Sequence, residues 1–223
     1  MVKKRVIMQK NSWNFWHAKN QRFVVVFDLD GTLVDSKQLY IDTIHSYLIE
    51  HYFIFPKSHV SKALGPKLEI TLRNISRFSQ DVLDELKKKI NKEVAHKASH
   101  LKLCPYAKSE LKKLNEKGCI IILLTNSAAS FAVNALKTHK VLRYFNKLFY
   151  AENFSSKEDA IKAIAKKYKT KVSDITYVAD KKSDVKIARN VGCKIVIVLA
   201  CSWDKSKFRG ERYIVKSLKD LVI

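Results

Sequence analysis

Residues 23–35 read Phe23-Val24-Val25-Val26-Phe27-Asp28-Leu29-Asp30-Gly31-Thr32-Leu33-Val34-Asp35. The first five are apolar without alternation, which is typical of a strand buried on both faces in a parallel α/β sheet. Asp28 follows this strand directly, and open α/β sheets bind ligands at the carboxyl ends of their strands. Asp30 comes two residues later, and Gly31 permits a tight turn that brings the two carboxylates together. The pair indicates a divalent-cation site or acid–base chemistry, although Asp and Gly also favour an ordinary turn.

Composition and charge narrow the class of protein. The chain has 223 residues and 47% of them are hydrophobic, which suits one large or two modest globular domains. It has no apolar run of about eighteen residues, so a transmembrane segment is not expected. The net charge of +22 favours anionic partners, namely nucleic acid, acidic membrane surfaces or phosphorylated metabolites. Most of the excess is lysine scattered over predicted helices, a pattern more typical of a solvated surface than of a binding groove.

The cysteines form neither a Cys-x-x-Cys pair nor a zinc-like spacing; they are Cys104, Cys119, Cys193 and Cys201. Cys119 and Cys193 adjoin apolar runs, where a reduced thiol packs as a small hydrophobic group. We therefore expect a cytoplasmic protein without disulfides.

Residues 1–22 form a basic leader that contains Trp13, Phe15 and Trp16 but no acidic residue. The leader lacks the apolar core of a signal peptide. It can bind nucleic acid or an anionic membrane, or its aromatic side chains can pack on the domain. We favour packing on the domain and keep nucleic acid as the alternative partner.

Residues 36–103 have a helical pattern throughout. Apolar residues recur at helical spacing at Ile41, Ile44 and Leu48. Pro66 is typical of a helix start, and Ser79 can cap a third helix. The sequence thus predicts an all-helical insert directly after the first strand.

Further apolar runs predict the rest of a sheet at residues 119–124, 147–151, 174–180 and 194–199, closed by residues 213–215 and a C-terminal helix. Helical patterns separate these runs, so the fold class is α/β. Thr125-Asn126-Ser127 follows the run at 119–124, where a hydroxyl group and the N–H groups of a new helix form an anion site, unless Ser127 is only a helix cap.

The last acidic residues follow the run at 174–180. Asp180 ends that run, and Asp184 lies four residues later, where it is either a ligand or a favourable charge in a first helical turn. Lys157 opens an earlier helix, a position that opposes the helix dipole and indicates a paired charge or a chance surface residue.

These motifs together resemble those of the haloacid dehalogenase-like hydrolases, in particular their phosphatase branch. Asp28-Leu29-Asp30-Gly31-Thr32-Leu33-Val34-Asp35-Ser36 is similar to the first motif of the family. The resemblance implies that Asp28 is the nucleophile and Asp30 the general acid and base. Residues 64–69 resemble the cap loop of phosphoglycolate phosphatase-like members.

The other motifs of the family fall on the remaining predicted site residues. The resemblance implies that Thr125, Asn126 and Lys157 bind phosphate. It assigns a magnesium ion to Asp28, Asp30, Asp180 and Asp184. Three positions depart from the family pattern: Glu158 stands in place of Pro, Ala179 in place of Gly, and Lys181 in place of a small hydroxyl residue.

The resemblance implies a Rossmann-like parallel sheet core over residues 23–35 and 104–223, with a helical cap over 36–103 and the leader over 1–22. It further implies a Mg²⁺-dependent phosphatase that forms an aspartyl-phosphate. A cap that closes over the site favours a small phosphorylated metabolite over a polymer end. The alternatives are a phosphomutase of the same superfamily and a non-catalytic protein that binds nucleic acid or a partner. The sequence leaves the oligomeric state open.

Overall fold

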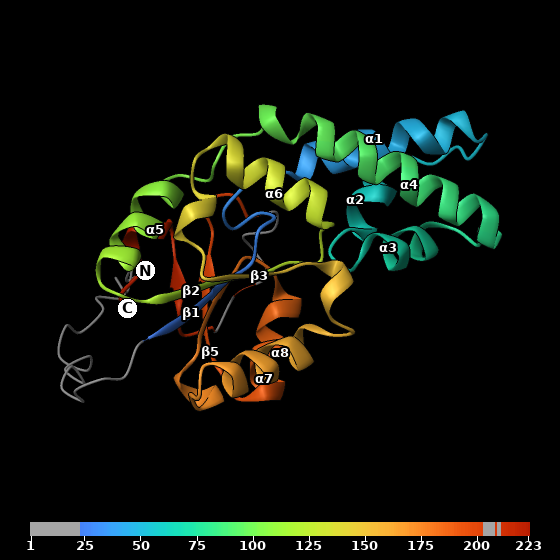
Figure 1. Cartoon of the computed structure of the whole chain (residues 1–223). Helices are drawn as coiled ribbons and strands as arrows, with labels where there is room; N and C mark the ends of the chain where they lie inside the picture. Colours follow the sequence, from blue (N-terminus) through green and yellow to red (C-terminus); the bar gives the residue numbers. More distant parts are fainter. Residues whose placement is uncertain (1–22, 203–207, 209–210) are drawn as a thin grey trace, which may run out of the picture.

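The computed structural model describes residues 23–202, 208 and 211–223, so the leader 1–22 lies outside the described residues. At the centre is a six-stranded sheet with the order β3-β2-β1-β4-β5-β6, in which all paired strands are parallel (Figure 1). The strands are β1 (Val24–Phe27), β2 (Ile120–Leu124), β3 (Lys147–Phe149), β4 (Thr176–Ala179), β5 (Lys194–Val198) and β6 (Ile214–Val215). The predicted α/β fold is confirmed.

Helices cover both faces of the sheet (Figure 1). They are α5 (Ala107–Glu116) and α6 (Ala129–Thr138) on one face, and α7 (Lys157–Lys167) and α8 (Lys182–Val191) on the other. Val25 and Phe27 of β1 pack into the same apolar cluster as buried residues of α5 and α6, whereas Val24 and Val26 pack with those of α7 and α8. All four side chains of β1 are therefore buried, as its unbroken apolar run predicts.

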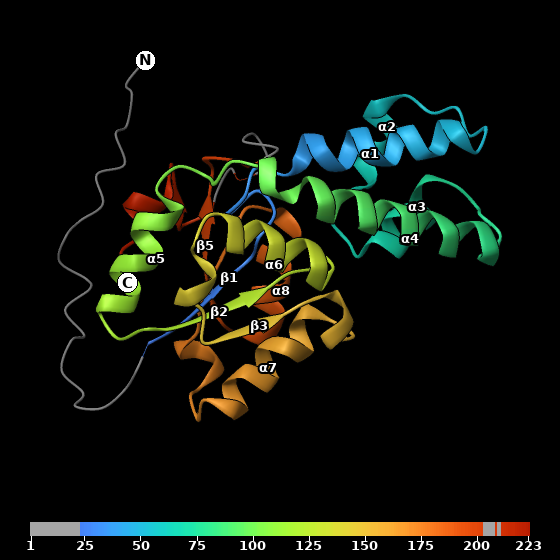
Figure 2. The ribbon, with the colours of Figure 1, turned by 45° about the horizontal axis from the view of Figure 1, so that its top comes forward.

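The helical insert lies between β1 and β2 and projects to one side of the sheet (Figure 2). It consists of α1 (Lys37–Glu50), α2 (Lys57–Ala63), α3 (Leu68–Ile75) and α4 (Gln80–Lys97), followed by a 3₁₀ turn at Ala98–His100. Helix α4 contacts α1 within the insert and α6 of the core. Val34 and Leu103, which flank the insert, form an isolated bridge. The division of the chain into leader, core and cap stays a prediction.

The structure differs from the predicted elements in several places. Helix α2 was not predicted, because Val60 is its one buried residue and gives no periodic apolar pattern. The predicted C-terminal helix is only a 3₁₀ turn at Leu218–Asp220. Ser79 occupies the N-cap position of α4 but makes no side-chain capping bond. Ser127 does not cap α6, whose N-cap residue is Ala128.

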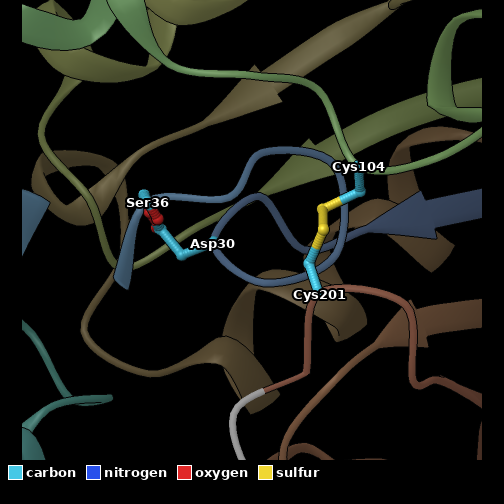
Figure 3. The surroundings of a disulfide bond; sticks show 4 residues. All are labelled: Asp30, Ser36, Cys104 and Cys201. Atoms are coloured by element: carbon cyan, nitrogen blue, oxygen red, sulfur yellow. A yellow bond between two sulfur atoms is a disulfide. The ribbon is translucent and has the colours of Figure 1, made fainter. Parts of the chain in front are cut away.

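Cys104 and Cys201 form a disulfide, with their Cα atoms 5.8 Å apart (Figure 3). The prediction of a disulfide-free protein is therefore wrong. The two residues are 97 positions apart in sequence, so only the fold reveals that they meet. Cys119 and Cys193 are free thiols, as predicted. The cytoplasmic location stays a prediction, and the cysteines no longer support it, because disulfides are rare in that compartment.

None of the helices in the described part of the chain combines the length and the apolar character that crossing a bilayer requires.

Candidate active site

The three central strands bring the predicted site residues to one edge of the sheet. Asp28 follows β1, Thr125 follows β2 and Asp180 follows β4, and these strands are neighbours in the order β2-β1-β4. The parallel registers place the three carboxyl ends side by side. The backbone N–H of Asp28 donates to the carbonyl of Val178 at 2.9 Å, which ties the start of the first motif to the neighbouring strand. The site thus lies where parallel sheets bind ligands.

Asp28, Asp180 and Asp184 form a buried carboxylate cluster. One oxygen of each lies within 4.8 Å of the others. Lys157, the first residue of α7, contacts the cluster: its Nζ lies 2.9 Å from Asp28 Oδ1 and 3.0 Å from Asp184 Oδ1. Only 6% of Lys157 is exposed, so this lysine is a paired charge and not a chance surface residue.

Burial and the lysines act in opposite directions on the acidity of the cluster. Burial raises the pKa of Asp28 against the attraction of Lys157. Burial also opposes the charge on Asp184, but Lys157, Lys181 and a hydrogen bond from Tyr177 outweigh it and lower the pKa of Asp184. Burial likewise disfavours the charged form of Lys157, yet Asp184 and Asp28 raise its pKa. The ion pair between Lys157 and Asp184 therefore stays charged over the physiological pH range.

Tyr177 supports this ion pair from within β4. Its hydroxyl oxygen lies 2.7 Å from Lys157 Nζ and 2.7 Å from Asp184 Oδ1. Sequence analysis did not identify this residue. A signal was present, because a tyrosine inside a buried strand needs a hydrogen-bond partner for its hydroxyl group.

Asp180 has the environment of a metal ligand. Within the described part of the chain, neither of its buried carboxylate oxygens has a hydrogen-bond partner, and Asp184 Oδ2 lacks one as well. Burial raises the pKa of Asp180 well above its ordinary value. Leaving a carboxylate buried and unpaired is costly, and a divalent cation that takes oxygen ligands removes this cost. The donor set therefore fits such a cation.

Asp30 lies apart from the carboxylate cluster and is held by hydroxyl groups. Ser36 Oγ donates to its Oδ1 at 2.5 Å, and Figure 3 shows these two side chains pointing toward one another. Ser127 Oγ donates to Asp30 Oδ2 at 2.6 Å and itself accepts from the hydroxyl of Tyr40 at 3.1 Å. The sequence did not reveal Ser36 or Tyr40, and it placed Ser127 either in an anion site with Thr125 and Asn126 or at a helix cap.

Thr125 also lies beside Asp30, with its Oγ1 3.4 Å from Asp30 Oδ2. It accepts a hydrogen bond from the backbone N–H of Ser127 at 3.0 Å. Asn126 contacts the helical insert, because its Nδ2 donates to the carbonyl of Gly65 at 3.1 Å. Residues 125–127, which follow β2, thus contact both Asp30 and Gly65.

A small cavity of about 50 Å³, which we call the inner cavity, opens onto the predicted site. Its wall includes Asp28, Asp30, Asn126, Ser127, Lys157 and Lys181, and residues 64–66, which we call the cap loop. Thr125 is not part of this wall. Lys181 is half-buried, and although burial disfavours its charge, Asp180 and Asp28 raise its pKa. The unusual residue at position 181 is therefore a cation that faces the cavity.

Curated relatives of the chain include phosphatases. It is 27% identical over 185 residues to a phosphoglycolate phosphatase of Vibrio parahaemolyticus, an alignment that covers 76% of this chain and 80% of the relative. It is 23% identical over 206 residues to the pyrophosphatase PpaX of Halalkalibacterium halodurans, an alignment that covers 89% of this chain and 91% of the relative. Among solved structures, a hydrolase from Pseudomonas syringae has the same fold, with a TM-score of 0.79 at 18% identity over 89% of this chain and 95% of that one.

Residues 25–198 match the family of haloacid dehalogenase-like hydrolases. The match extends from β1 through the helical insert to β5, so it includes the insert, the carboxylate cluster and Lys157. The chain therefore belongs to the haloacid dehalogenase-like hydrolase family.

Proposed function

We propose that the protein is a Mg²⁺-dependent phosphatase that hydrolyses a small phosphorylated metabolite through an aspartyl-phosphate on Asp28. One observation carries the proposal: the buried cluster of Asp28, Asp180 and Asp184 around Lys157 at the carboxyl edge of the sheet. A catalyst of phosphoryl transfer must neutralise the phosphoryl oxygens and hold attacking and leaving groups in line. The phosphatase relatives support the same reaction class.

Asp28 and Asp30 divide the chemistry in this proposal. Lys157 orients the carboxylate of Asp28, which attacks phosphorus and releases the alcohol. Asp30, held by Ser36 and Ser127, gives the leaving oxygen its proton and then takes one from the water that hydrolyses the acyl phosphate. The second step regenerates the Asp28 carboxylate and the proton of Asp30, and the net products are the alcohol and orthophosphate.

Magnesium suits the carboxylates of Asp28, Asp180 and Asp184, with the backbone carbonyl of Asp30 as a further ligand, because it prefers a few carboxylates and keeps several waters. When bound, it would neutralise charge on the phosphoryl oxygens. Lys157 adds a second positive charge at the same place, and Asn126 contributes a hydrogen-bond donor on the cavity wall.

The cap supports a small substrate. The cap loop forms part of the wall of the inner cavity and is joined to the core by the hydrogen bond between Asn126 and Gly65. A polymer end has little room beneath such a cover. Nucleic acid therefore stays the less favoured partner.

The test is phosphate release from p-nitrophenyl phosphate with and without Mg²⁺, for the wild type, Asp28→Asn and Asp35→Asn. Asp35 is an exposed acid of the same loop and serves as the matched control. We expect Mg²⁺-dependent release that Asp28→Asn abolishes and Asp35→Asn retains. Full activity in Asp28→Asn would refute the proposed nucleophile. Transfer of phosphate between positions of a sugar phosphate, without free phosphate, would indicate a mutase.

A further inference from the structure

Two cavities meet at Lys157 and Lys181. The inner cavity, at about 50 Å³, has room for only a few heavy atoms beside Asp28. The second, which we call the outer cavity, measures about 880 Å³. The two share walls at Leu64, Gly65, Pro66, Asn126, Lys157 and Lys181. A substrate whose reacting phosphoryl group lies against Asp28 therefore extends into the outer cavity.

Lysines dominate the wall of the outer cavity. The five are Lys37, Lys62, Lys157, Lys181 and Lys182. The carboxylates on the described part of this wall are Asp180 and Asp184, and both belong to the cluster that the reacting group uses. The positive charge beyond the reacting centre thus exceeds what one phosphoryl group requires.

Three of these lysines stand where helices begin. Lys37 is the first residue of α1, Lys157 of α7 and Lys182 of α8. A cation at a helix start opposes the helix dipole and is therefore unfavourable there. The N–H groups of a helix start themselves attract anions. The ion pairs with Asp28 and Asp184 offset this cost for Lys157. An anion in the outer cavity would offset it for Lys182.

A lysine-rich surface alone means little in a chain of net charge +22. On the exposed face of α4, however, lysines pair with carboxylates one turn away, such as Lys89 with Glu85 at 2.7 Å and Lys97 with Glu93 at 2.8 Å. The lysines of the outer cavity come from separate elements and line one cavity. Lys181 in particular crosses to the cap, because its Cδ would lie 3.8 Å from a Cβ built on Gly65.

We propose that the substrate carries a second phosphoryl group, which Lys62, Lys181 and Lys182 bind in the outer cavity. This inference rests on the proposed phosphatase function. A phosphoryl group brings up to two negative charges and several acceptor oxygens, which suit a set of point-charge ammonium groups. Arginine, whose planar fork matches a carboxylate, does not occur on the described wall of this cavity.

The volume of the outer cavity falls within the range of small-molecule sites, roughly 300–1,000 Å³. The two phosphoryl groups therefore either share an organic scaffold of metabolite size or are joined directly. In both arrangements the lysines bind a phosphoryl group, and the experiment below distinguishes a sugar bisphosphate from pyrophosphate.

The experiment measures competition against p-nitrophenyl phosphate at constant free Mg²⁺. The competitors are fructose 1,6-bisphosphate, inorganic pyrophosphate and fructose 6-phosphate, and the enzymes are the full-length wild type, Lys62→Gln and Lys57→Gln. Lys57 lies on α2 like Lys62, but pairs with Asp42 outside the cavity and is the matched control. We expect a competitor with two phosphoryl groups to inhibit at least about tenfold more tightly than fructose 6-phosphate.

Lys62→Gln is expected to remove most of this preference, and Lys57→Gln to retain it. Preference for the sugar bisphosphate indicates an organic scaffold, and preference for pyrophosphate indicates directly joined groups. Equal inhibition by all three competitors, or equal effects of the two variants, would overturn the inference while aryl phosphate hydrolysis continues. Absence of aryl phosphate hydrolysis in the wild type would instead refute the proposed function.

Discussion

At the scale of single residues, Gly31 has the least room for a side chain among the glycines of the described residues. Its φ of +81° lies in the left-handed region, and a Cβ on it would lie 2.3 Å from Asp180 Oδ2. We predict that Gly31→Ala displaces the Asp180 carboxylate and weakens Mg²⁺ binding about 10–100-fold. The strained backbone should also lower the free energy of unfolding by about 1–3 kcal/mol. Titration calorimetry with Mg²⁺ and urea unfolding measure the two effects separately.

Gly192 provides the matched control for Gly31. Its φ is +80°, but a Cβ on it would meet no atom within 4 Å. Gly192→Ala should therefore show the backbone strain alone and bind Mg²⁺ as tightly as the wild type. Equal loss of Mg²⁺ affinity in both variants would contradict the predicted clash with Asp180.

The raised pKa of Asp180 predicts a pH dependence of metal binding. Burial lifts this pKa well above 3.8, so in the metal-free protein the folded state loses stability as the pH rises from 3.8 through the raised value. Below the raised pKa, Mg²⁺ must displace the proton of the Asp180 carboxyl group before it can bind. Above that pKa, Mg²⁺ binds a carboxylate that is already charged. We predict that added Mg²⁺ increases the melting temperature more at high pH than at low pH. Thermal unfolding with and without Mg²⁺ from about pH 5 to about pH 9 tests this, and a constant shift would contradict it.

Several site residues were predictable because the residues beside them in the sequence show where they lie. Asp28 and Asp180 each end an apolar strand, so strand pattern and residue type together indicate a site. Tyr177 and Ser36 were not predictable in the same way, since their partners lie on other elements. The direction in which Lys181 points depends on the cap loop and could not be read from the sequence.

At the scale of elements, Lys67, which precedes α3, joins the helical insert to the segment after β3. Lys67 Nζ donates to the carbonyl of Ala151 at 2.6 Å and to that of Phe154, and it lies 4.7 Å from the centre of the Phe154 ring. We predict that Lys67→Ala frees the cap loop, raising amide hydrogen exchange in residues 64–72 and the KM for aryl phosphate. Lost hydrogen bonds to a charged group are worth about 1.5–3 kcal/mol. Exchange measured by mass spectrometry reports the opening.

Lys57→Ala is the control for Lys67→Ala, because the ion pair of Lys57 with Asp42 joins two helices of the insert and does not reach the core. Exchange at residues 64–72 should stay at the wild-type level in this variant. A similar increase in both variants would mean that general loosening of the insert, and not release from the core, causes the effect.

The elements themselves were largely predictable from the sequence. Unbroken apolar runs predicted β1 and β2, and a largely apolar run predicted β4, because both faces of a central parallel strand are covered. Helix α2 was missed because Val60 alone is buried and the rest of the helix has no apolar stripe. The last helix was predicted in error, since the chain there makes one 3₁₀ turn against the core.

At the scale of the whole molecule, the disulfide between Cys104 and Cys201 links the residue after the insert to the loop after β5. It closes a ring over a sequence separation of 97 residues, and a ring of about 100 residues restricts the unfolded chain by an estimated 4.7 kcal/mol. We predict that reduction lowers the melting temperature of the wild type to that of a Cys104→Ser/Cys201→Ser variant. Thermal unfolding with and without reductant measures the shift.

The double variant is its own control for the reductant, because its melting temperature should not respond to reduction. An equal response in wild type and variant would assign the effect to the reductant and not to the disulfide. This pairing could not be predicted, because the two thiols are 97 positions apart in sequence and only the fold brings them together.

The place of β1 in the sheet affects how the protein is made. β1 lies in the sheet between β2 and β4, yet β2 follows it in the chain by about 100 residues, and a ribosome adds ~5–20 residues per second. The run of valines and phenylalanine in β1 therefore leaves the ribosome roughly 5–20 s before its first partner strand exists. Among the described residues, the insert and α5 are what the chain offers to cover β1 during that interval. A nascent chain halted before β2 should therefore be the form that most needs a chaperone.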